Sequence, residues 1–218
     1  MNRVLSLGLD GRWRATFARA IASSLPARAR ILDIACGTGD LGVAVKRVLP
    51  GSRIDGIDIS NAMLDVARSK PEAAASYDSL AVADAANLPF EDASFDCAMC
   101  AFGFRNFPDR AAALKEAARV VRPGGRLHVL EFFRPHGLIV PAIVSSWLWL
   151  APRIFARGAL SEYGHLRRSI AAMDGVGEFS DAACAAGFTA ISRRTFLPAA
   201  TAVGFGRENT CFNGKISV

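Results

Sequence analysis

The sequence is poor in the residues that bind metals. Only 3 of its 218 residues are histidine, and its one close pair of cysteines, Cys97 and Cys100, lies in an apolar segment expected to form a strand. On a strand, residues three apart point to opposite faces, so these two thiols are badly placed to share a metal ion. No second pair follows at zinc spacing. We therefore expect no metal site, and five free thiols are typical of a reducing cytoplasm.

The sequence also lacks a long apolar run. The most apolar stretch, 138–150, is too short to span a bilayer and contains Pro141. Arg12 and Arg14 interrupt the apolar residues near the start, so no signal peptide is evident. These features predict a cytoplasmic protein.

Acidic residues are the minority charge, with 20 Asp and Glu against 26 Lys and Arg and a net charge of +6. This balance favours anionic partners, although a solvated basic surface is an equal alternative. The arginines are dispersed and no recognition module is visible, so we expect no nucleic-acid binding. The charge and the tryptophans in 138–150 favour peripheral contact with the inner face of the cytoplasmic membrane.

The composition indicates a globular chain, with 51% hydrophobic and 21% charged residues. We expect one domain over 1–218 that begins with a helical segment, 1–28. In that segment, Trp13, Phe17, Ile21 and Leu25 recur at a four-residue step, which is typical of one helix face. The expected strands span 31–35, 53–58, 80–83, 95–101, 126–132, 189–196 and 201–206. The expected helices that follow the first segment span 41–49, 62–68, 109–121, 161–173 and 179–186.

Strands separated by single helices predict a Rossmann-like, doubly wound α/β fold with a mostly parallel seven-stranded sheet. The alternation breaks after the fifth strand, where 134–178 is expected to be a helical lid. In open α/β sheets the ligand binds beyond the carboxyl ends of the strands. An insertion at this point is therefore expected to hang over the ligand site.

A glycine-rich turn follows the first expected strand. Gly37, Gly39 and Gly42 form a G-x-G-x-x-G pattern, which lets the backbone turn sharply and approach a ligand closely. The pattern alone also fits a dinucleotide site. Asp33 and Asp40 flank the turn, and carboxylates here would repel a phosphate. They suit a ligand with an ammonium and a sulfonium group, so we expect S-adenosyl-L-methionine.

Further polar residues follow the next two strands. Asp58 ends the second strand, at a distance along the chain that suits the ribose hydroxyls. Asp84 follows the third and is placed to receive the adenine amino group, with the N–H of Ala85 beside it, and Met63 is expected to pack on the adenine. Asp58 and Asp84 each have an alternative role as a cap or turn residue. The full expected cofactor set is Asp33, Ala35, Gly37, Thr38, Gly39, Asp58, Ile59, Met63, Asp84, Ala85 and Ala101.

Several longer motifs carry a resemblance to a known family. They are ILDIACGTGD at 31–40, LPF at 88–90, FGFRNFPD at 102–109, VVRPGG at 120–125 and LEFFRP at 130–135. With them, nearly the whole chain resembles the UbiE/MenG family of quinone-biosynthesis C-methyltransferases. The glycine and RPGG motifs are general to class I methyltransferases, whereas FG-x-RN and LEF-x-x-P are more specific.

The resemblance implies methylation of a ring carbon of a lipophilic, polyprenylated quinol in menaquinone or ubiquinone biosynthesis. The acceptor would be demethylmenaquinol or 2-polyprenyl-6-methoxy-1,4-benzoquinol. It also implies cofactor contacts by Thr38, Asp58, Asp84 and Ala85, and by residue 101. That residue is alanine here where the family often has serine. The family also has a Tyr-Asp pair before the position at which this chain begins, so a shortened start is expected.

We hypothesise a mechanism in which a phenolate pushes charge onto the attacking ring carbon. Arg105 would stabilise that phenolate, directly or through water, and Asn106 would position it. Glu131 is the second candidate for proton acceptor, because arginine stays protonated. Tyr163, with His165, would contact the ring from the lid. The alternative for Arg105 is a structural ion pair with Asp109.

Other functions stay open at this point. The first is a methyltransferase that acts on another small-molecule acceptor through the same cofactor site. The second is an NAD-dependent oxidoreductase, and the third is a partner protein without catalytic activity. The sequence does not decide between a monomer and a homodimer.

Overall fold

The computed structural model describes residues 10–134, 168–169, 172–196 and 200–207, which form a seven-stranded mixed sheet with helices on both faces. The strands lie in the order β3-β2-β1-β4-β5-β7-β6. The first five of these are parallel, and β7 runs antiparallel to both β5 and β6. The strands are β1 (Arg30–Ile34), β2 (Arg53–Asp58), β3 (Ser79–Val82), β4 (Phe95–Ala101), β5 (Val121–Glu131), β6 (Phe188–Phe196) and β7 (Ala200–Arg207). This arrangement confirms the expected doubly wound, mostly parallel sheet.

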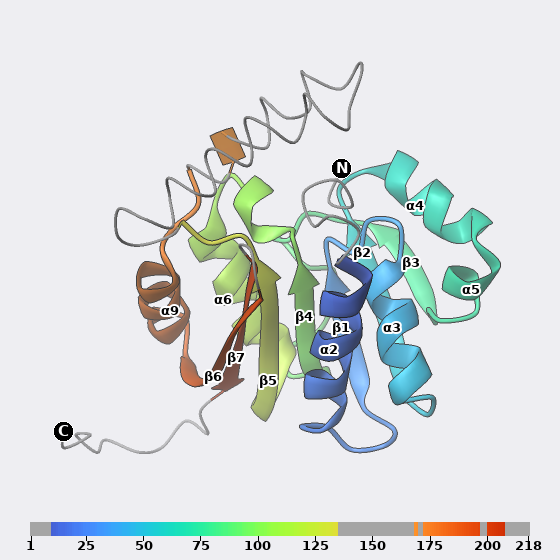
Figure 1. Ribbon diagram of the computed structural model, residues 1–218, viewed down its shortest axis with the longest axis horizontal. Helices are drawn as coiled ribbons and strands as arrows, with labels where there is room; N and C mark the ends of the chain where they lie inside the picture. Colours follow the sequence, from blue (N-terminus) through green and yellow to red (C-terminus); the bar gives the residue numbers. More distant parts are fainter. Residues whose placement is uncertain (1–9, 135–167, 170–171, 197–199, 208–218) are drawn as a thin grey trace.

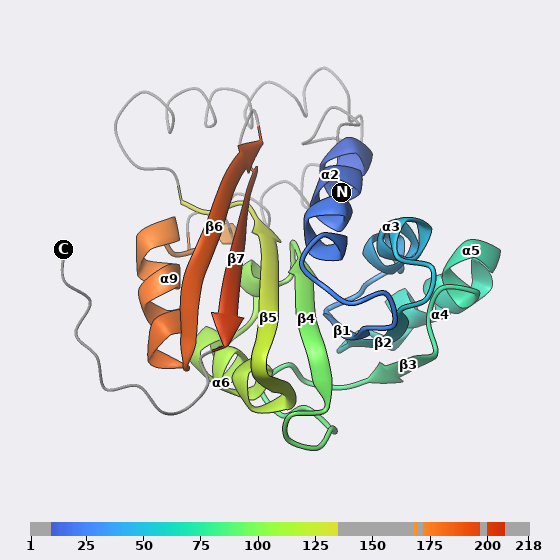
Figure 2. The same ribbon diagram turned by 90° about the horizontal axis from the view of Figure 1, so that it is seen from below.

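Different helices cover the two faces of the sheet, as Figures 1 and 2 show. The helices are α2 (Asp10–Ala22), α3 (Asp40–Val48), α4 (Asn61–Ser69), α5 (Pro71–Ala74), the 3₁₀ turn η1 (Phe104–Asn106), α6 (Arg110–Val120) and α9 (Val176–Ala185). α2 and α3 pack on one face, and α6 and α9 on the other. Three residues of the expected stripe, Trp13, Phe17 and Ile21, are buried on α2, whereas Leu25 lies beyond the end of the helix and is partly buried.

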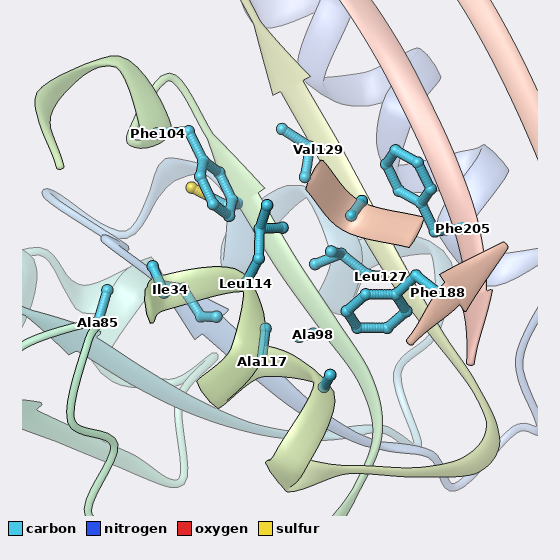
Figure 3. Packing of buried hydrophobic residues seen from close by; sticks show 14 of the residues in the cluster. Ile34, Ala85, Ala98, Phe104, Leu114, Ala117, Leu127, Val129, Phe188 and Phe205 are labelled. Atoms are coloured by element: carbon cyan, nitrogen blue, oxygen red, sulfur yellow. The ribbon is translucent and has the colours of Figure 1, made fainter. Parts of the chain in front are cut away.

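Two apolar clusters lie on opposite sides of the sheet, and β4 contributes to both. Cys97 and Met99 belong to the cluster beneath α2 and α3, whereas Ala98 and Cys100 belong to the cluster beneath α6 and α9. Figure 3 shows the second cluster, where Leu114 packs among residues of the sheet. The two cysteines therefore point to opposite faces, as expected. A central strand buried on both faces needs such a continuous apolar run.

Some boundaries differ from the expectation. β5 begins at Val121 instead of 126, because the Pro123-Gly124-Gly125 segment continues the strand after α6 ends at Val120. α9 begins at Val176, so the expected lid boundary at 178 lies inside this helix. The short elements α5 and η1 were not expected at all.

Most of the expected lid lies outside the described residues. Within the expected lid, residues 168–169 are helical. Arg134, at its start, donates its backbone N–H to the carbonyl of Asp174, near its end, at 3.1 Å. The two flanks of the insertion are therefore held together beside α6 and α9. Among the described residues, no helix has the length and apolar content that a membrane span requires.

Candidate active site

The turn after β1 has the backbone conformation that the glycine pattern predicts. Gly37 and Gly39 have φ values of +56° and +83°, in the left-handed region. Ala35 also has a positive φ, +56°, which is strained for a residue with a Cβ. No described heavy atom lies within 4 Å of the position that a Cβ would take at Gly37. Among the described residues, therefore, no atom covers the backbone of the turn at Gly37.

Asp58 joins this turn to the end of β2. One carboxylate oxygen accepts a hydrogen bond from the N–H of Gly37 at 2.8 Å, and the other accepts one from Ser60 at 2.9 Å. Beside it, Ile59 is 73% exposed and Met63 is 48% exposed, although most large apolar side chains are buried. The structure thus places a carboxylate next to an open apolar surface. Both features suit a nucleoside, whose ribose is polar and whose base is flat.

Asp84 and Ala85 follow β3. Asp84 is exposed, and its carboxylate accepts a hydrogen bond from the N–H of Ala86 at 2.9 Å, so it has the alternative turn role. Ala85 is buried. Their contact with a base stays a prediction.

Arg119 on α6 holds the loop that follows them. Its guanidinium donates to the carbonyls of Leu88 and Phe90, at 2.9 and 2.7 Å, and pairs with Asp92 and Glu116. Glu116 in turn accepts the N–H of Leu88 at 2.8 Å. These bonds give the LPF segment a structural role, which sequence reasoning missed.

Carboxylates dominate the charge around the turn. The ammonium of Lys70 lies 2.9 Å from a carboxylate oxygen of Asp40 and also donates to the carbonyl of Thr38 at 3.1 Å. Burial raises the pKa of Asp40, but the hydrogen bond and charge of Lys70 outweigh this effect and hold the pKa below its usual value. Thr38 donates its hydroxyl to Asp40 at 3.3 Å. Lys70 therefore balances Asp40, whereas Asp33 and Asp58 have no such close ion pair among the described residues.

Asp33 is 1% exposed and bonds to a residue that sequence reasoning missed. The hydroxyl of Tyr77 donates to its Oδ2 at 2.6 Å, whereas its Oδ1 has no hydrogen-bond partner in the described part of the chain. Burial raises the pKa of Asp33 to about 7, and the Tyr77 hydrogen bond and the charge of Arg14 oppose that rise. Glycines leave room for the Tyr77 ring, but nothing in the sequence pairs it with Asp33.

Next to the glycine turn, η1 follows the end of β4. A Cβ at Gly103 would approach the Cβ of Ala35 to 2.8 Å, so the two turns lie in close contact. Ala101 is the last residue of β4 and is partly buried. Phe102 has a φ of +62°, a strained value for a bulky residue. Strain of this kind is concentrated at functional sites, and it occurs here at the ends of two neighbouring strands.

Arg105 forms a buried ion pair, but its partner is Glu131 and not Asp109. Its Nη1 lies 2.6 Å from a carboxylate oxygen of Glu131, and the side chains are 3% and 0% exposed. Asp109 caps α6 instead, accepting the N–H of Ala112 at 2.8 Å. The expected alternative pair was therefore wrong. Asn106, the last residue of η1, is exposed.

Aromatic rings surround this ion pair. The guanidinium of Arg105 lies 5.8 Å from the ring centre of Phe102 and 5.7 Å from that of Phe132, and these two rings stack at 4.8 Å. Trp13 meets Phe132 edge-on, and Arg14 lies over Phe102. The site thus joins a carboxylate-lined turn to an aromatic and cationic region. Tyr163 and His165 lie outside the described residues.

Comparisons with known proteins agree with this geometry. The model of the ubiE/COQ5 methyltransferase family matches residues 1–207. A demethylmenaquinone methyltransferase of Deinococcus radiodurans is 43% identical over 176 residues, which are 79% of this chain and 72% of that protein. A ubiquinone/menaquinone biosynthesis C-methyltransferase UbiE of Syntrophotalea carbinolica is 36% identical over 198 residues, 89% of this chain and 82% of that protein.

A solved structure shares the fold. It is that of a putative sarcosine dimethylglycine methyltransferase from Galdieria sulphuraria, with a TM-score of 0.68 and 16% identity. The match covers 91% of this chain and 85% of the other.

Proposed function

The chain belongs to the ubiE/COQ5 methyltransferase family, and from this membership we propose that it methylates a ring carbon of a polyprenylated quinol with S-adenosyl-L-methionine. The acceptor is demethylmenaquinol or 2-polyprenyl-6-methoxy-1,4-benzoquinol, in line with the names of the relatives. The observation that carries the proposal is the carboxylate-lined glycine turn, where Asp58 bonds to Gly37 and no atom of the described residues covers Gly37.

The residues present fit the cofactor. The buried Oδ1 of Asp33, which has no hydrogen-bond partner among the described residues, supplies negative charge for an ammonium group, and the carboxylate of Asp58 supplies acceptors for ribose hydroxyls. Ile59 and Met63 offer apolar surface for the adenine. Asp84 and Ala85 complete the site for the adenine base. Thr38, Gly39 and Ala101 line the rest of the cofactor site. When bound, S-adenosylmethionine supplies a methyl group activated on a positively charged sulfur.

The acceptor side supplies the guanidinium of Arg105, which is paired with Glu131, among aromatic rings. We assign the acceptor ring to this region, because a quinol is flat and apolar and stacks on aromatic side chains. Arg105 stabilises negative charge on the quinol oxygen, directly or through a water, and Asn106 positions that oxygen. Glu131 holds Arg105 in place and is the second candidate for proton acceptor. Tyr163 contacts the acceptor ring.

A further proposal concerns contact with the membrane. The net charge of +6 supports peripheral contact with anionic membrane, where the lipophilic acceptor resides. Flotation with anionic vesicles tests this contact, and a protein that stays at the bottom of the gradient contradicts it. Sedimentation equilibrium distinguishes a monomer from a homodimer.

Calorimetry and turnover together test the proposed function. We expect the purified chain to bind S-adenosylmethionine and S-adenosylhomocysteine. Arg105→Lys should bind both as tightly as the unchanged protein and turn over far more slowly, whereas the exposed Arg47→Lys should match the unchanged protein in both respects. Binding without methylation of any quinol would instead favour another small-molecule acceptor. Equal turnover in Arg105→Lys would remove Arg105 from the mechanism.

A further inference from the structure

Tyr77 lies between three elements that meet at the glycine turn. A Cβ built at Gly42 would come within 2.3 Å of its ring and its hydroxyl, and one at Gly56 would come within 2.8 Å of the ring. At Gly39 the nearest ring atom would be 3.2 Å away. These three glycines, from the turn, α3 and β2, therefore make the space that the phenol ring fills.

The hydroxyl of Tyr77 serves two hydrogen bonds in that space. It accepts the N–H of Gly42 at 3.1 Å and donates to Oδ2 of Asp33 at 2.6 Å. Gly42 is the third residue of α3, and the residue before this helix, Gly39, has no side chain to cap it. The hydroxyl thus takes the place of a capping side chain for an N–H that the helix leaves unsatisfied. One atom links the start of α3 to the buried carboxyl group of β1.

We propose that Tyr77 is a positioning residue of the cofactor site, which fixes the buried carboxyl group of Asp33 beside the glycine turn, so that its negative charge attracts the cationic part of the bound cofactor. The inference rests on the proposed function, since it assumes a cationic ligand at the glycine turn. Tyr77 itself touches neither the cofactor nor the acceptor. It acts by donating to one oxygen of Asp33 and fixing the position of the carboxyl group.

The charges around Asp33 make its ionisation depend on this hydrogen bond. Burial, together with the nearby carboxylate of Asp58, raises the pKa of Asp33, and the net value is about 7. The Tyr77 hydroxyl and Arg14 on α2 lower it. The neighbouring thiols of Cys36, Cys97 and Cys100 stay neutral, because burial raises the pKa of each.

A bound cation favours the ionised carboxylate, so binding releases a proton from Asp33 to solvent. Without the Tyr77 hydroxyl, the pKa of Asp33 should rise by about one to two pH units, the usual effect of a hydrogen bond to a charged group. At pH 7 the fraction of the protein in which Asp33 is ionised, which is the form that binds the cofactor, would then fall roughly tenfold. The cofactor affinity would fall by the same factor.

The first test follows Asp33 in the ligand-free chain. Carbon-13 NMR of aspartate carboxyl groups, assigned with Asp33→Asn, should show a midpoint near pH 7 for the unchanged protein. Tyr77→Phe keeps the ring and should move that midpoint upward. The matched control is Ser52→Ala, which removes another buried hydroxyl, one that donates to the carbonyl of Leu49, and should leave the midpoint unmoved. A midpoint in Tyr77→Phe within about 0.3 pH units of the unchanged protein overturns the proposal.

The second test measures binding of S-adenosylmethionine from pH 6 to 8 by calorimetry in buffers of different ionisation heat. Tyr77→Phe should bind roughly tenfold more weakly at pH 7, with a smaller deficit at pH 8. An equal deficit at every pH would show a merely structural role. If Tyr77→Phe does not fold, 3-fluorotyrosine incorporation strengthens the donor and should move the Asp33 midpoint downward. Failure of the unchanged protein to bind the cofactor would refute the proposed function, whereas the NMR titration would separately show whether the Tyr77 hydroxyl lowers the pKa of Asp33.

Discussion

Replacing Glu131 with glutamine is the sharpest perturbation of the acceptor side. The Oε1 atom of Glu131 accepts from Nη1 of Arg105 at 2.6 Å and from the N–H of Phe132 at 2.8 Å, and Oε2 accepts from the N–H of Arg105 at 3.2 Å. Every one of these partners is a donor. A glutamine supplies only one acceptor oxygen, so its NH₂ group must face a donor, and the negative charge opposite Arg105 is lost.

The expected cost is large because the side chain of Glu131 is 0% exposed and that of Arg105 is 3% exposed. Removal of one member of a buried ion pair typically costs about 3 to 5 kcal/mol, since water cannot screen the charge that stays behind. We expect Glu131→Gln to lower the free energy of unfolding by about that amount. Urea unfolding followed by circular dichroism measures it, with an unchanged dependence on urea concentration.

Two further variants serve as controls for this prediction. Asp65→Asn breaks an exposed pair with Arg68 on α4 and should cost less than about 1 kcal/mol. The double change Arg105→Met with Glu131→Gln removes both charges and keeps an acceptor oxygen for a backbone N–H group, so it should recover part of the stability that Glu131→Gln alone loses. A loss in Glu131→Gln no larger than that in Asp65→Asn would refute the view that this ion pair organises the turn after β4.

Three further predictions concern the site and the sheet. Gly42→Ala should destabilise the protein by about 1 to 3 kcal/mol in urea unfolding, because its Cβ would collide with Tyr77. Gly177→Ala is the control, since no atom of the described residues lies within 4 Å of its Cβ, and it should not destabilise the protein. Equal effects of the two changes would contradict the packing of Tyr77 against Gly42. Asp58→Asn should weaken S-adenosylmethionine binding in calorimetry by roughly tenfold or more, because hydrogen bonds to a charged acceptor are lost, and unchanged affinity would exclude a contact with Asp58. Burial, aided by the charge of Arg126, lowers the pKa of His128 to about 4. The folded state therefore favours neutral His128, and the resulting stability is fully present above pH 6.5 and is lost as the pH falls toward 4. Relative to His128→Gln, the unchanged protein should lose roughly 3 kcal/mol of unfolding free energy between pH 6.5 and 4, and parallel pH profiles would contradict this.

The sequence patterns that predicted the fold were short apolar runs bounded by polar or turn residues. β2 and β4 have the expected bounds, 53–58 and 95–101, because such runs end where the backbone must leave the sheet. The carboxylates at strand ends were predictable for the same reason, since the carboxyl ends of parallel strands share one edge. The continuation of β5 through Pro123 was not, because proline normally indicates a strand end.

Contacts between distant residues explain what the sequence could not predict. Asp109 lies four residues after Arg105 and was a reasonable partner by spacing, but capping α6 uses its carboxylate. The true partner, Glu131, is 26 residues away and meets Arg105 only because β4 and β5 are neighbours in the sheet. Tyr77 lies just before β3 and reaches Asp33 of β1 across 44 residues, although β2 lies between these two strands.

Mass spectrometry can detect methyl transfer to a quinol directly. The purified chain is incubated with S-adenosylmethionine that carries a carbon-13 methyl group and with a mixture of demethylmenaquinol and 2-polyprenyl-6-methoxy-1,4-benzoquinol, both kept reduced. We expect one of the two quinols to gain a single labelled methyl group on a ring carbon, and Arg105→Lys to slow this gain strongly. Bound cofactor with both quinols unlabelled, or a label found on a quinol oxygen, would contradict it.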